Sequence, residues 1–325
     1  MSSSITLPNA SSYHVPIMVE QILQHLHVSA HHTYLDATLG GGGHSEALLQ
    51  HSSPDGKVIG LDRDPEAILE ASTRLAPFGD RFQAVQSNYS AMRTVLDDLG
   101  IDFVDGLLLD AGVSSHQLDD ADRGFSFRNS GPLDMRMGPD DNTPTLEQFL
   151  HTQDEESLAK ILKEYGELKG SYRVAKAIIS AFSAGKITNT GELSQVVVSA
   201  IQPGLMRRMN INPATLAFQA LRIAINDELS HLREAVYSAV ECVRPGGYIA
   251  LMCFHSLEDR IVKQGFRHLA NPCECPPGLP ACVCHKQPRL EIVTRKPLKA
   301  SDKECEANPR ARSAVLRIAK VLPTT

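Results

Sequence analysis

The segment that most restricts the fold is YLDATLGGGGHSEALL, from Tyr34 to Leu49, in which an apolar run ends at four consecutive glycines. Glycine loses more conformational entropy on folding than any other residue, so it is retained where the backbone must turn tightly or approach a ligand. About 20 residues after the glycines, a second apolar run, KVIGLD, ends in Asp62. A glycine-rich turn after one strand and an acid at the end of the next are typical of a nucleoside-binding fold, in which the acid accepts hydrogen bonds from ribose.

Strand-like and helix-like segments alternate over the first hundred residues. We predict strands at 33–39, 57–62, 82–86 and 104–110, and helices at 44–51, 64–75 and 91–99. Such alternation predicts an α/β fold with a parallel sheet and right-handed crossovers. After residue 212 we predict further alternation, with a long helix at 213–242, a strand at 248–254, a helix from Ser256, and candidate strands at 290–294 and 314–321.

The segment 116–212 has no strong strand pattern, and helical patterns recur around 146–149, 157–165, 172–184 and 192–201. We therefore predict a catalytic domain made of residues 13–115 and 213–325. Residues 116–212 would form an inserted helical domain that recognises the substrate. The polar segment 1–12 is expected to be a disordered N-terminus, and it lacks the features of a signal peptide.

The residues around the glycines favour one of two nucleoside ligands. A dinucleotide fingerprint requires G-x-G-x-x-G, but Gly40 and Gly42 are followed by Ser45 where the third glycine would stand. Asp36, on the strand before the turn, suits the ammonium group of an amino-acid moiety and has no evident partner in a pyrophosphate. The pattern therefore favours S-adenosylmethionine, and a dinucleotide-dependent oxidoreductase is the alternative.

The charge of the chain is unevenly distributed. The formal net charge is −6, but residues 260–325 contain 13 Lys and Arg against 5 Asp and Glu, a net of +8, which leaves −14 for the remainder. A basic segment on an acidic body is consistent with a local phosphate-binding face. No apolar run approaches the roughly 20 residues that cross a bilayer, so we expect no membrane segment.

Seven cysteines without a secretory signal indicate reduced thiols in a cytoplasmic protein. Four of them, Cys273, Cys275, Cys282 and Cys284, form a compact cluster that could hold structural zinc. The C-x-C spacing is tighter than the usual C-x2-C, however. We therefore expect unliganded thiols and no metal.

Eight stretches in order identify a family resemblance. The chain resembles the bacterial small-subunit ribosomal RNA cytosine-N4 methyltransferases, the RsmH or MraW family, in these segments: HVPIM from His14, DATLGGGGHS from Asp36, GLDRDP from Gly60, LLLDAGVSSHQLDDADRGFSF from Leu107, GPLDMRM from Gly131, NPATLAFQALRIAINDEL from Asn212, FHSLEDRIVK from Phe254 and NPRARSAVLRIA from Asn308.

The resemblance implies a Rossmann-like class I methyltransferase sheet with an inserted all-helical domain. It implies transfer of a methyl group from S-adenosylmethionine to N4 of a cytidine in the decoding region of 16S rRNA, with the small ribosomal subunit as partner. By motif position, the donor-binding residues implied are Gly42, Gly43, His44, Asp62, Tyr89, Asp110 and Gln117. A non-catalytic RNA-binding assembly factor is a further alternative, and a homodimer is left open.

Acceptor-side residues are harder to assign. The chain has Asp110-Ala111-Gly112 after its fourth strand in place of the D/N/S-P-P-Y/F of many amino-methyltransferases. We take Asp110 and His255 as candidate catalytic residues and Phe254 as a stacking platform for an extruded base. The alternative is that Ser256 caps the following helix while Phe254 ends a core strand.

Three arginines are candidate RNA contacts. Arg310 and Arg312 precede the final strand, and guanidinium groups suit phosphate. Arg136 lies in the loop entering the insertion, near Phe125 and Phe127. These two aromatic residues suit either single-stranded RNA or the core of the insertion.

Overall fold

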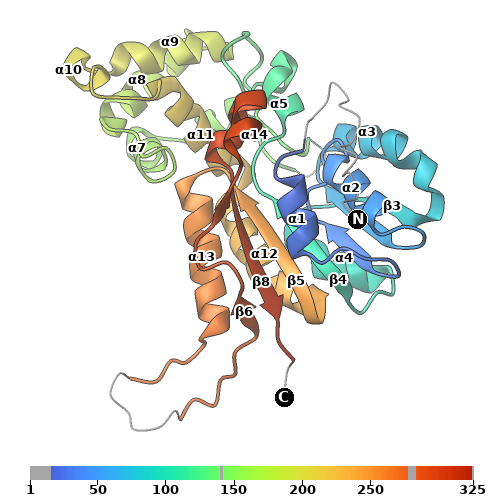
Figure 1. The fold of residues 1–325 in the computed structure, drawn as a ribbon. Helices are drawn as coiled ribbons and strands as arrows, with labels where there is room; N and C mark the ends of the chain where they lie inside the picture. The colour runs from blue at the N-terminus through green and yellow to red at the C-terminus, as the bar shows by residue number, and fades with distance from the viewer. Residues whose placement is uncertain (1–15, 140–141, 277–282, 324–325) are drawn as a thin grey trace. The chain divides into compact units, whose positions relative to one another are not determined.

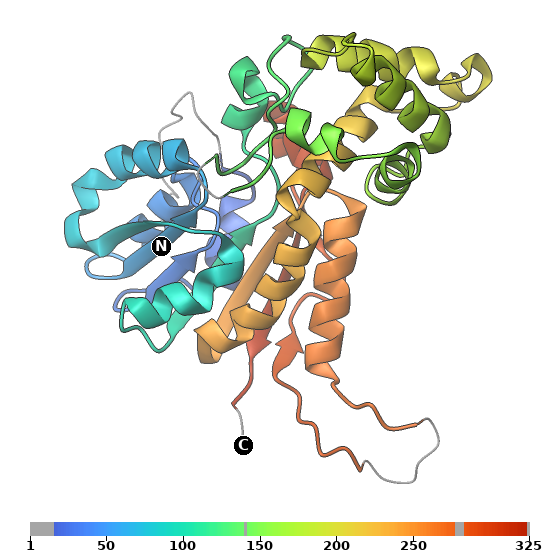
Figure 2. The ribbon, with the colours of Figure 1, turned by 180° about the vertical axis from the view of Figure 1, so that it is seen from behind.

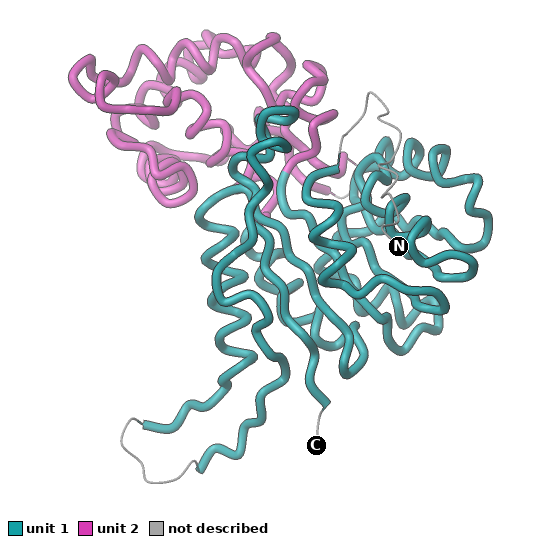
Figure 3. The backbone as a smooth tube through the Cα atoms, viewed as in Figure 1, with its two compact units in different colours: residues 1–112, 229–325 teal, residues 113–228 magenta. Residues whose placement is uncertain are grey.

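The computed structural model describes residues 16–139, 142–276 and 283–323, and the chain divides into two compact units (Figure 3). Unit 1 comprises residues 1–112 and 229–325, and unit 2 comprises residues 113–228. The expected insertion was 116–212; the units differ from it mainly because the helix α11 (Pro213–Asn226) belongs to unit 2. The expected disorder of residues 1–12 lies outside the described residues.

Unit 1 is built on an eight-stranded sheet with the order β3-β2-β1-β4-β5-β8-β6, and β7 also pairs with β8 (Figure 1). β1 to β5 are parallel, and β8 runs antiparallel to β5 and β6. This confirms the expected Rossmann-like class I sheet. The strands are β1 (Thr33–Asp36), β2 (Lys57–Asp62), β3 (Phe82–Gln86), β4 (Val104–Asp110), β5 (Val243–Cys253), β6 (Leu290–Ile292), β7 (Leu298–Lys299) and β8 (Val315–Val321).

Helices cover both faces of this sheet, because its central strands are apolar on both sides. Along β4, Leu107 and Leu109 pack with α4 (Met92–Asp98), α12 (Glu228–Cys242) and α13 (Ser256–Ala270). Leu108 packs on the other face with α1 (Val19–His25), α2 (Gly43–His51) and α3 (Pro65–Leu75). Figure 2 shows α12 and α13, light orange and orange, in front of the sheet. The remaining helices of the unit are η1 (Ala76–Arg81), η2 (Tyr89–Ala91), α14 (Asp302–Ala307) and η4 (Pro309–Ser313).

The topology fixes where ligands can bind. From β1 the chain passes outward to β2 and β3, then returns to the other side of β1 as β4. In open α/β sheets the crevice lies beyond the carboxyl ends of the strands at such a switch point. β1 ends at Asp36 and β4 at Asp110, so two acidic residues stand at this edge.

The described residues of unit 2 form helices and connecting loops and include no strand, as expected for an inserted all-helical domain. Its own core is closed by Leu158, Val174, Leu193 and Leu221, each at 0% exposure. The helices are α5 (Ser115–Asp119), η3 (Ala121–Arg123), α6 (Leu146–His151), α7 (Glu155–Glu164), α8 (Ser171–Ser183), α9 (Thr190–Ala200), α10 (Pro203–Met206) and α11 (Pro213–Asn226).

The single helix predicted at 213–242 is wrong. Asp227 adopts a left-handed conformation, with φ 46° and ψ 39°, and ends α11, after which α12 begins at Glu228. The junction is tied within unit 2 by a bidentate ion pair, in which Arg222 donates to Glu228 at 2.7 and 2.9 Å.

None of the helices formed by the described residues has the length and apolar character that a bilayer crossing requires.

Candidate functional site

The glycine turn connects β1 to α2. Gly40 and Gly42 have φ values of +50° and +76°, a region in which side chains are strained. A Cβ at Gly42 would lie 3.1 Å from Leu75 Cδ1, whereas a Cβ at Gly40 would meet nothing within 4 Å. Gly42 therefore packs the turn against α3, while Gly40 faces open space. At Gly43 the first turn of α2 begins, and its N–H groups have no acceptor within the helix.

Asp62 connects the turn to β2. Its Oδ2 accepts the Gly40 N–H at 2.8 Å, and its Oδ1 accepts the Asp64 N–H at 2.9 Å. Burial raises the pKa of Asp62 to about 6, because desolvation outweighs the two hydrogen bonds. Each carboxylate oxygen accepts more than one hydrogen bond, so ribose hydroxyls can still be bound.

Asp36 and His44 form a buried pair beneath the turn. Asp36 is fully buried, and its Oδ2 accepts the Ser45 hydroxyl at 2.7 Å. Burial raises the pKa of Asp36, and burial lowers the pKa of His44. The His44 Nε2 donates to the Ile17 carbonyl at 2.9 Å. The imidazole is therefore held inside the protein, and what His44 presents at the turn is its backbone.

Asp110 ends β4 beside these residues. Thr38 Oγ1 accepts its backbone N–H at 2.6 Å, which ties the end of β4 to the turn. Its Oδ1 is buried and has no hydrogen-bond partner among the described residues. Burial raises the pKa of Asp110 well above its usual value, and the negative charges of Asp36 and Glu258 raise it further. A buried acid without a donor is costly, which indicates that a cationic or hydrogen-bonding ligand belongs there.

Tyr89 opens η2 just after β3 and is half-buried. Two residues before it, the Ser87 N–H donates to the backbone carbonyl of Asp62 at 2.8 Å. This bond places the chain just before Tyr89 beside the end of β2, and the Tyr89 side chain packs partly against the core of unit 1.

The residues after β5 face the end of β4. Glu258 is 1% exposed, and its Oε2 accepts the backbone N–H groups of Phe254 and His255 at 2.7 and 3.2 Å. His255 is the N-cap of α13, so the sequence-based alternative that Ser256 caps this helix is wrong. A Cβ at Gly112 would lie 3.6 Å from Phe254 and 3.8 Å from Glu258. Phe254 and Glu258 thus border the chain just beyond Asp110.

The side chain of His255 is 13% exposed, and its Nε2 lies 2.9 Å from Glu258 Oε1 without the angular geometry of a hydrogen bond. The sequence analysis did not identify Glu258 as a site residue. The capping pattern H-S-L-E was its only sequence signal.

Arg310 and Arg312 lie in η4, immediately before β8. Arg312 is exposed and Arg310 is half-buried. The η4 backbone is fixed because Asn308 Oδ1 accepts the Arg310 N–H at 3.1 Å.

Two predicted site residues lie in unit 2. Gln117 is 6% exposed and forms a capping box with Ser114, so its side-chain oxygen serves α5. Arg136 forms a bidentate ion pair with Asp134 at 2.9 and 2.8 Å, and it also donates to the Pro139 carbonyl. A role for either residue in ligand binding stays a prediction.

The aromatic residues of the same loop belong to the core of unit 2. Phe125 is 5% exposed, and the Phe127 ring lies 5.0 Å from the Phe218 ring in an edge-on contact. Of the two readings left open by the sequence, these positions favour the structural one.

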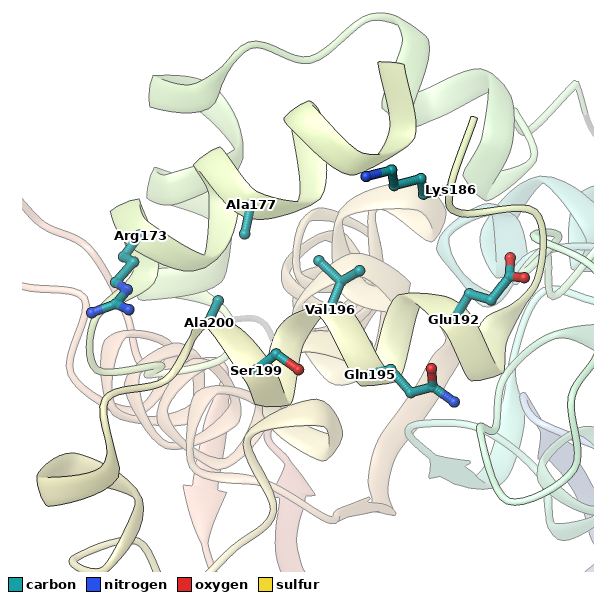
Figure 4. Close-up of a pocket in the computed structure, with 8 residues that line it drawn as sticks. All are labelled: Arg173, Ala177, Lys186, Glu192, Gln195, Val196, Ser199 and Ala200. Carbon is teal, nitrogen blue, oxygen red and sulfur yellow. The ribbon is translucent and has the colours of Figure 1, made fainter. Parts of the chain in front are cut away.

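An open groove of about 500 Å³ lies between α8 and α9 within unit 2 (Figure 4). Arg173 stands at one end, and Lys186 and Glu192 stand at the other. Thr188 donates to the Glu192 carboxylate from its N–H and its hydroxyl, at 2.7 and 2.9 Å. These two hydrogen bonds stabilise the negative charge of Glu192 at the start of α9. The other lining residues are Ala177, Gln195, Val196, Ser199 and Ala200.

This chain is similar to known proteins over nearly all of its length. A family model described as the MraW methylase family matches residues 11–322. A protein of Geobacter sulfurreducens named ribosomal RNA small subunit methyltransferase H is 49% identical over 312 residues, which is 95% of this chain and 99% of that protein. A protein of the same name from Symbiobacterium thermophilum is 48% identical over 306 residues, 94% of this chain and 95% of that protein. The similarity therefore spans both compact units.

Proposed function

Because this chain belongs to the MraW methylase family, we propose that it transfers a methyl group from S-adenosylmethionine to N4 of a cytidine in the decoding region of 16S rRNA. The observation that carries the proposal is the buried, unpartnered Oδ1 of Asp110, with the charges of Asp36 and Glu258 acting on it. Such a site favours a positively charged ligand. S-adenosylmethionine carries a sulfonium and an ammonium group, whereas the pyrophosphate of a dinucleotide would add negative charge.

The residues of unit 1 fit the parts of this donor. The first N–H groups of α2, at Gly43 and His44, suit the methionine carboxylate, because helix N-termini bind anions. Asp62 suits the ribose hydroxyls and Tyr89 suits the adenine ring. When bound, the donor supplies a methyl group on positively charged sulfur, which becomes a neutral thioether after transfer.

The acceptor amine needs help from the protein, because the lone pair of cytosine N4 is delocalised into the ring. Asp110 can accept a hydrogen bond from the amine and hold its lone pair toward the methyl carbon. The amine gives up one proton as the nitrogen–carbon bond forms, and Asp110 Oδ1 is our candidate for receiving it. Phe254 would stack on the extruded base, and His255 would hydrogen-bond its edge.

We infer that cationic side chains in both units bind the rRNA. In unit 1, Arg312 and Arg310 supply guanidinium groups ahead of β8. In unit 2, the groove between α8 and α9 combines Arg173 and Lys186 with an apolar floor of Ala177 and Val196. Side chains of this kind suit a sugar–phosphate backbone. An acceptor in the small ribosomal subunit implies action in the cytoplasm.

Calorimetry separates the donor hypotheses. We expect S-adenosylhomocysteine to bind the purified chain and NAD to show no binding. Binding of NAD alone would reject the proposal in favour of the dinucleotide enzyme.

Methyl transfer is tested on ribosomal particles. Small subunits from cells without this protein should accept label from methyl-labelled donor, and mass spectrometry should locate it on N4 of one decoding-region cytidine. Donor binding without any transfer to subunits or to naked 16S rRNA would favour the assembly factor. Label at another atom would correct the acceptor.

A further inference from the structure

Three cysteine thiols converge in the connection between α13 and β6. The sulfur atoms of Cys273, Cys275 and Cys284 all lie within 4.8 Å of one another. The described parts of this connection, orange in Figures 1 and 2, run out beyond the end of α13. α13 has 15 residues and is therefore about 22 Å long. It begins at Ser256, three residues after the end of β5, and ends at Ala270, shortly before Cys273. The thiols are thus remote from the proposed donor site.

The sulfur separation matches metal coordination. Cys284 Sγ lies 3.8 Å from Cys273 Sγ. Zinc–thiolate bonds of about 2.3 Å in a tetrahedron place two sulfur atoms about 3.8 Å apart. A disulfide would require about 2.0 Å. The C-x-C spacing, from which we expected no metal, does not prevent the two thiols of Cys273 and Cys275 from converging with Cys284.

A backbone N–H and a cation lie near the sulfur atoms. The Val283 N–H donates to Cys275 Sγ at 3.3 Å, which stabilises negative charge on sulfur. Lys286 pairs with Glu274 at 2.5 Å, and its charge also interacts with Cys284. The Val283 N–H and the Lys286 ammonium group would offset part of the charge that three thiolates around one ion accumulate.

We propose that Cys273, Cys275 and Cys284 bind one Zn²⁺ as thiolates. Binding releases three protons to solvent and involves no oxidation or reduction. The ion pins the start of the connection, just after α13, to its later part, ahead of β6. We assign the site a structural role, because it lies away from the donor residues.

Zinc content tests the proposal directly. The full chain, without a histidine tag and purified under reducing conditions, should contain about one zinc per chain by mass spectrometry of the metal. Cys273→Ser and Cys284→Ser should each lower zinc content at least severalfold. Cys305→Ser is the matched control, because this half-buried thiol lies on α14 and should leave zinc unchanged.

Cobalt substitution and donor binding complete the test. With Co²⁺ in place of zinc, thiolate-to-metal absorption should fall with each cysteine removed from the cluster. S-adenosylhomocysteine affinity of the variants should match the wild type, which shows that they are folded.

Three outcomes would overturn the zinc site. They are a chain that neither contains zinc nor takes up Zn²⁺ when reduced, zinc content insensitive to both serine variants, and a disulfide joining cluster cysteines as the form recovered from cells. Because each readout is independent of methyl transfer, failure here leaves the proposed function untouched.

Discussion

Asp110 destabilises the donor-free protein at neutral pH. Its pKa is raised by burial, so the folded state holds a proton over a pH range in which the unfolded chain has already released it. Stability therefore falls as pH rises through that range. A ligand cation would remove this penalty, and the destabilisation of the empty site is thus part of the selectivity for a positively charged donor.

We predict that Asp110→Asn stabilises the donor-free chain at pH 8 by about 1 kcal/mol, the lower range for an unsatisfied buried group. The difference should shrink as pH falls, because the wild-type acid becomes neutral. Methyl transfer should drop about 10²-fold or more. Thermal unfolding at several pH values and labelled-donor assays measure the two effects. A variant less stable than wild type at pH 8 would contradict the assignment of an unpaired charge.

Asp62 predicts a pH dependence of donor binding. With a pKa of about 6 in the donor-free protein, the carboxylate that accepts ribose hydroxyls is mostly protonated at pH 5. S-adenosylhomocysteine affinity should therefore be about tenfold weaker at pH 5 than at pH 7. Calorimetry across this range tests it.

Asp62→Ala is the control for that titration. It should weaken donor binding at pH 7 by about 1.5–3 kcal/mol, as expected for hydrogen bonds to a charged acceptor. Its pH dependence should be flatter than that of the wild type. Equal affinity for the variant would show that ribose is bound elsewhere.

For individual residues, the sequence predicted which residues belong to the donor site better than it predicted their contacts. Asp62 was expected to bind ribose, and its contact with the Gly40 N–H was not foreseen. His44 was expected to bind donor, but its ring donates to Ile17. Both contacts depend on segments distant in sequence, and no local pattern encodes them.

The elements of the sheet follow from local sequence. Apolar runs ending in an acid, as at Asp62 and Asp110, gave the bounds of β2 and β4 without error. The break between α11 and α12 was missed, because Asp227 adopts its left-handed conformation inside a segment with continuous helical periodicity. A local reading cannot detect a break that tertiary packing imposes.

The glycine turn yields a paired prediction. Gly42→Ala adds a Cβ 3.1 Å from Leu75 and 3.2 Å from Ala71 at a positive φ, so the chain should lose about 1–3 kcal/mol of stability. Gly40→Ala meets only open space, and its φ of +50° should cost about 1 kcal/mol.

Donor binding should show a different pattern. A methyl group at Gly40 would project toward the proposed ligand, so Gly40→Ala should weaken S-adenosylhomocysteine binding more than its stability loss suggests. Denaturant unfolding and calorimetry on the two variants measure both quantities. Unchanged affinity in Gly40→Ala would mean that the donor does not approach this face of the turn.

On the scale of the whole molecule, charge is divided between an acidic body and the basic segment 260–325. Replacing Arg310 and Arg312 together by Ala should lower RNA affinity and reduce the log–log salt slope by about two units. Donor affinity should stay the same, because neither residue belongs to the donor site.

The alternative for these arginines is structural bracing of the body through acids such as Asp122 or Asp141, the latter outside the described residues. Bracing predicts an earlier melting transition in the double variant with an unchanged salt slope. Melting temperature and RNA salt slope, measured on one preparation, decide between the two roles.

The position of β8 affects how the protein is made. β8 lies between β5 and β6 in the sheet, yet it is the last of the strands to be synthesised. About 70 residues separate the end of β5 from the end of β8, which a ribosome adds in about 3–14 seconds. During that interval β5 presents an open apolar edge, and β6 has no neighbour to pair with. Unit 2, by contrast, is fully synthesised before β5 begins. The nascent chain should therefore acquire its helical unit first, and it should depend most on chaperones just before β8 emerges.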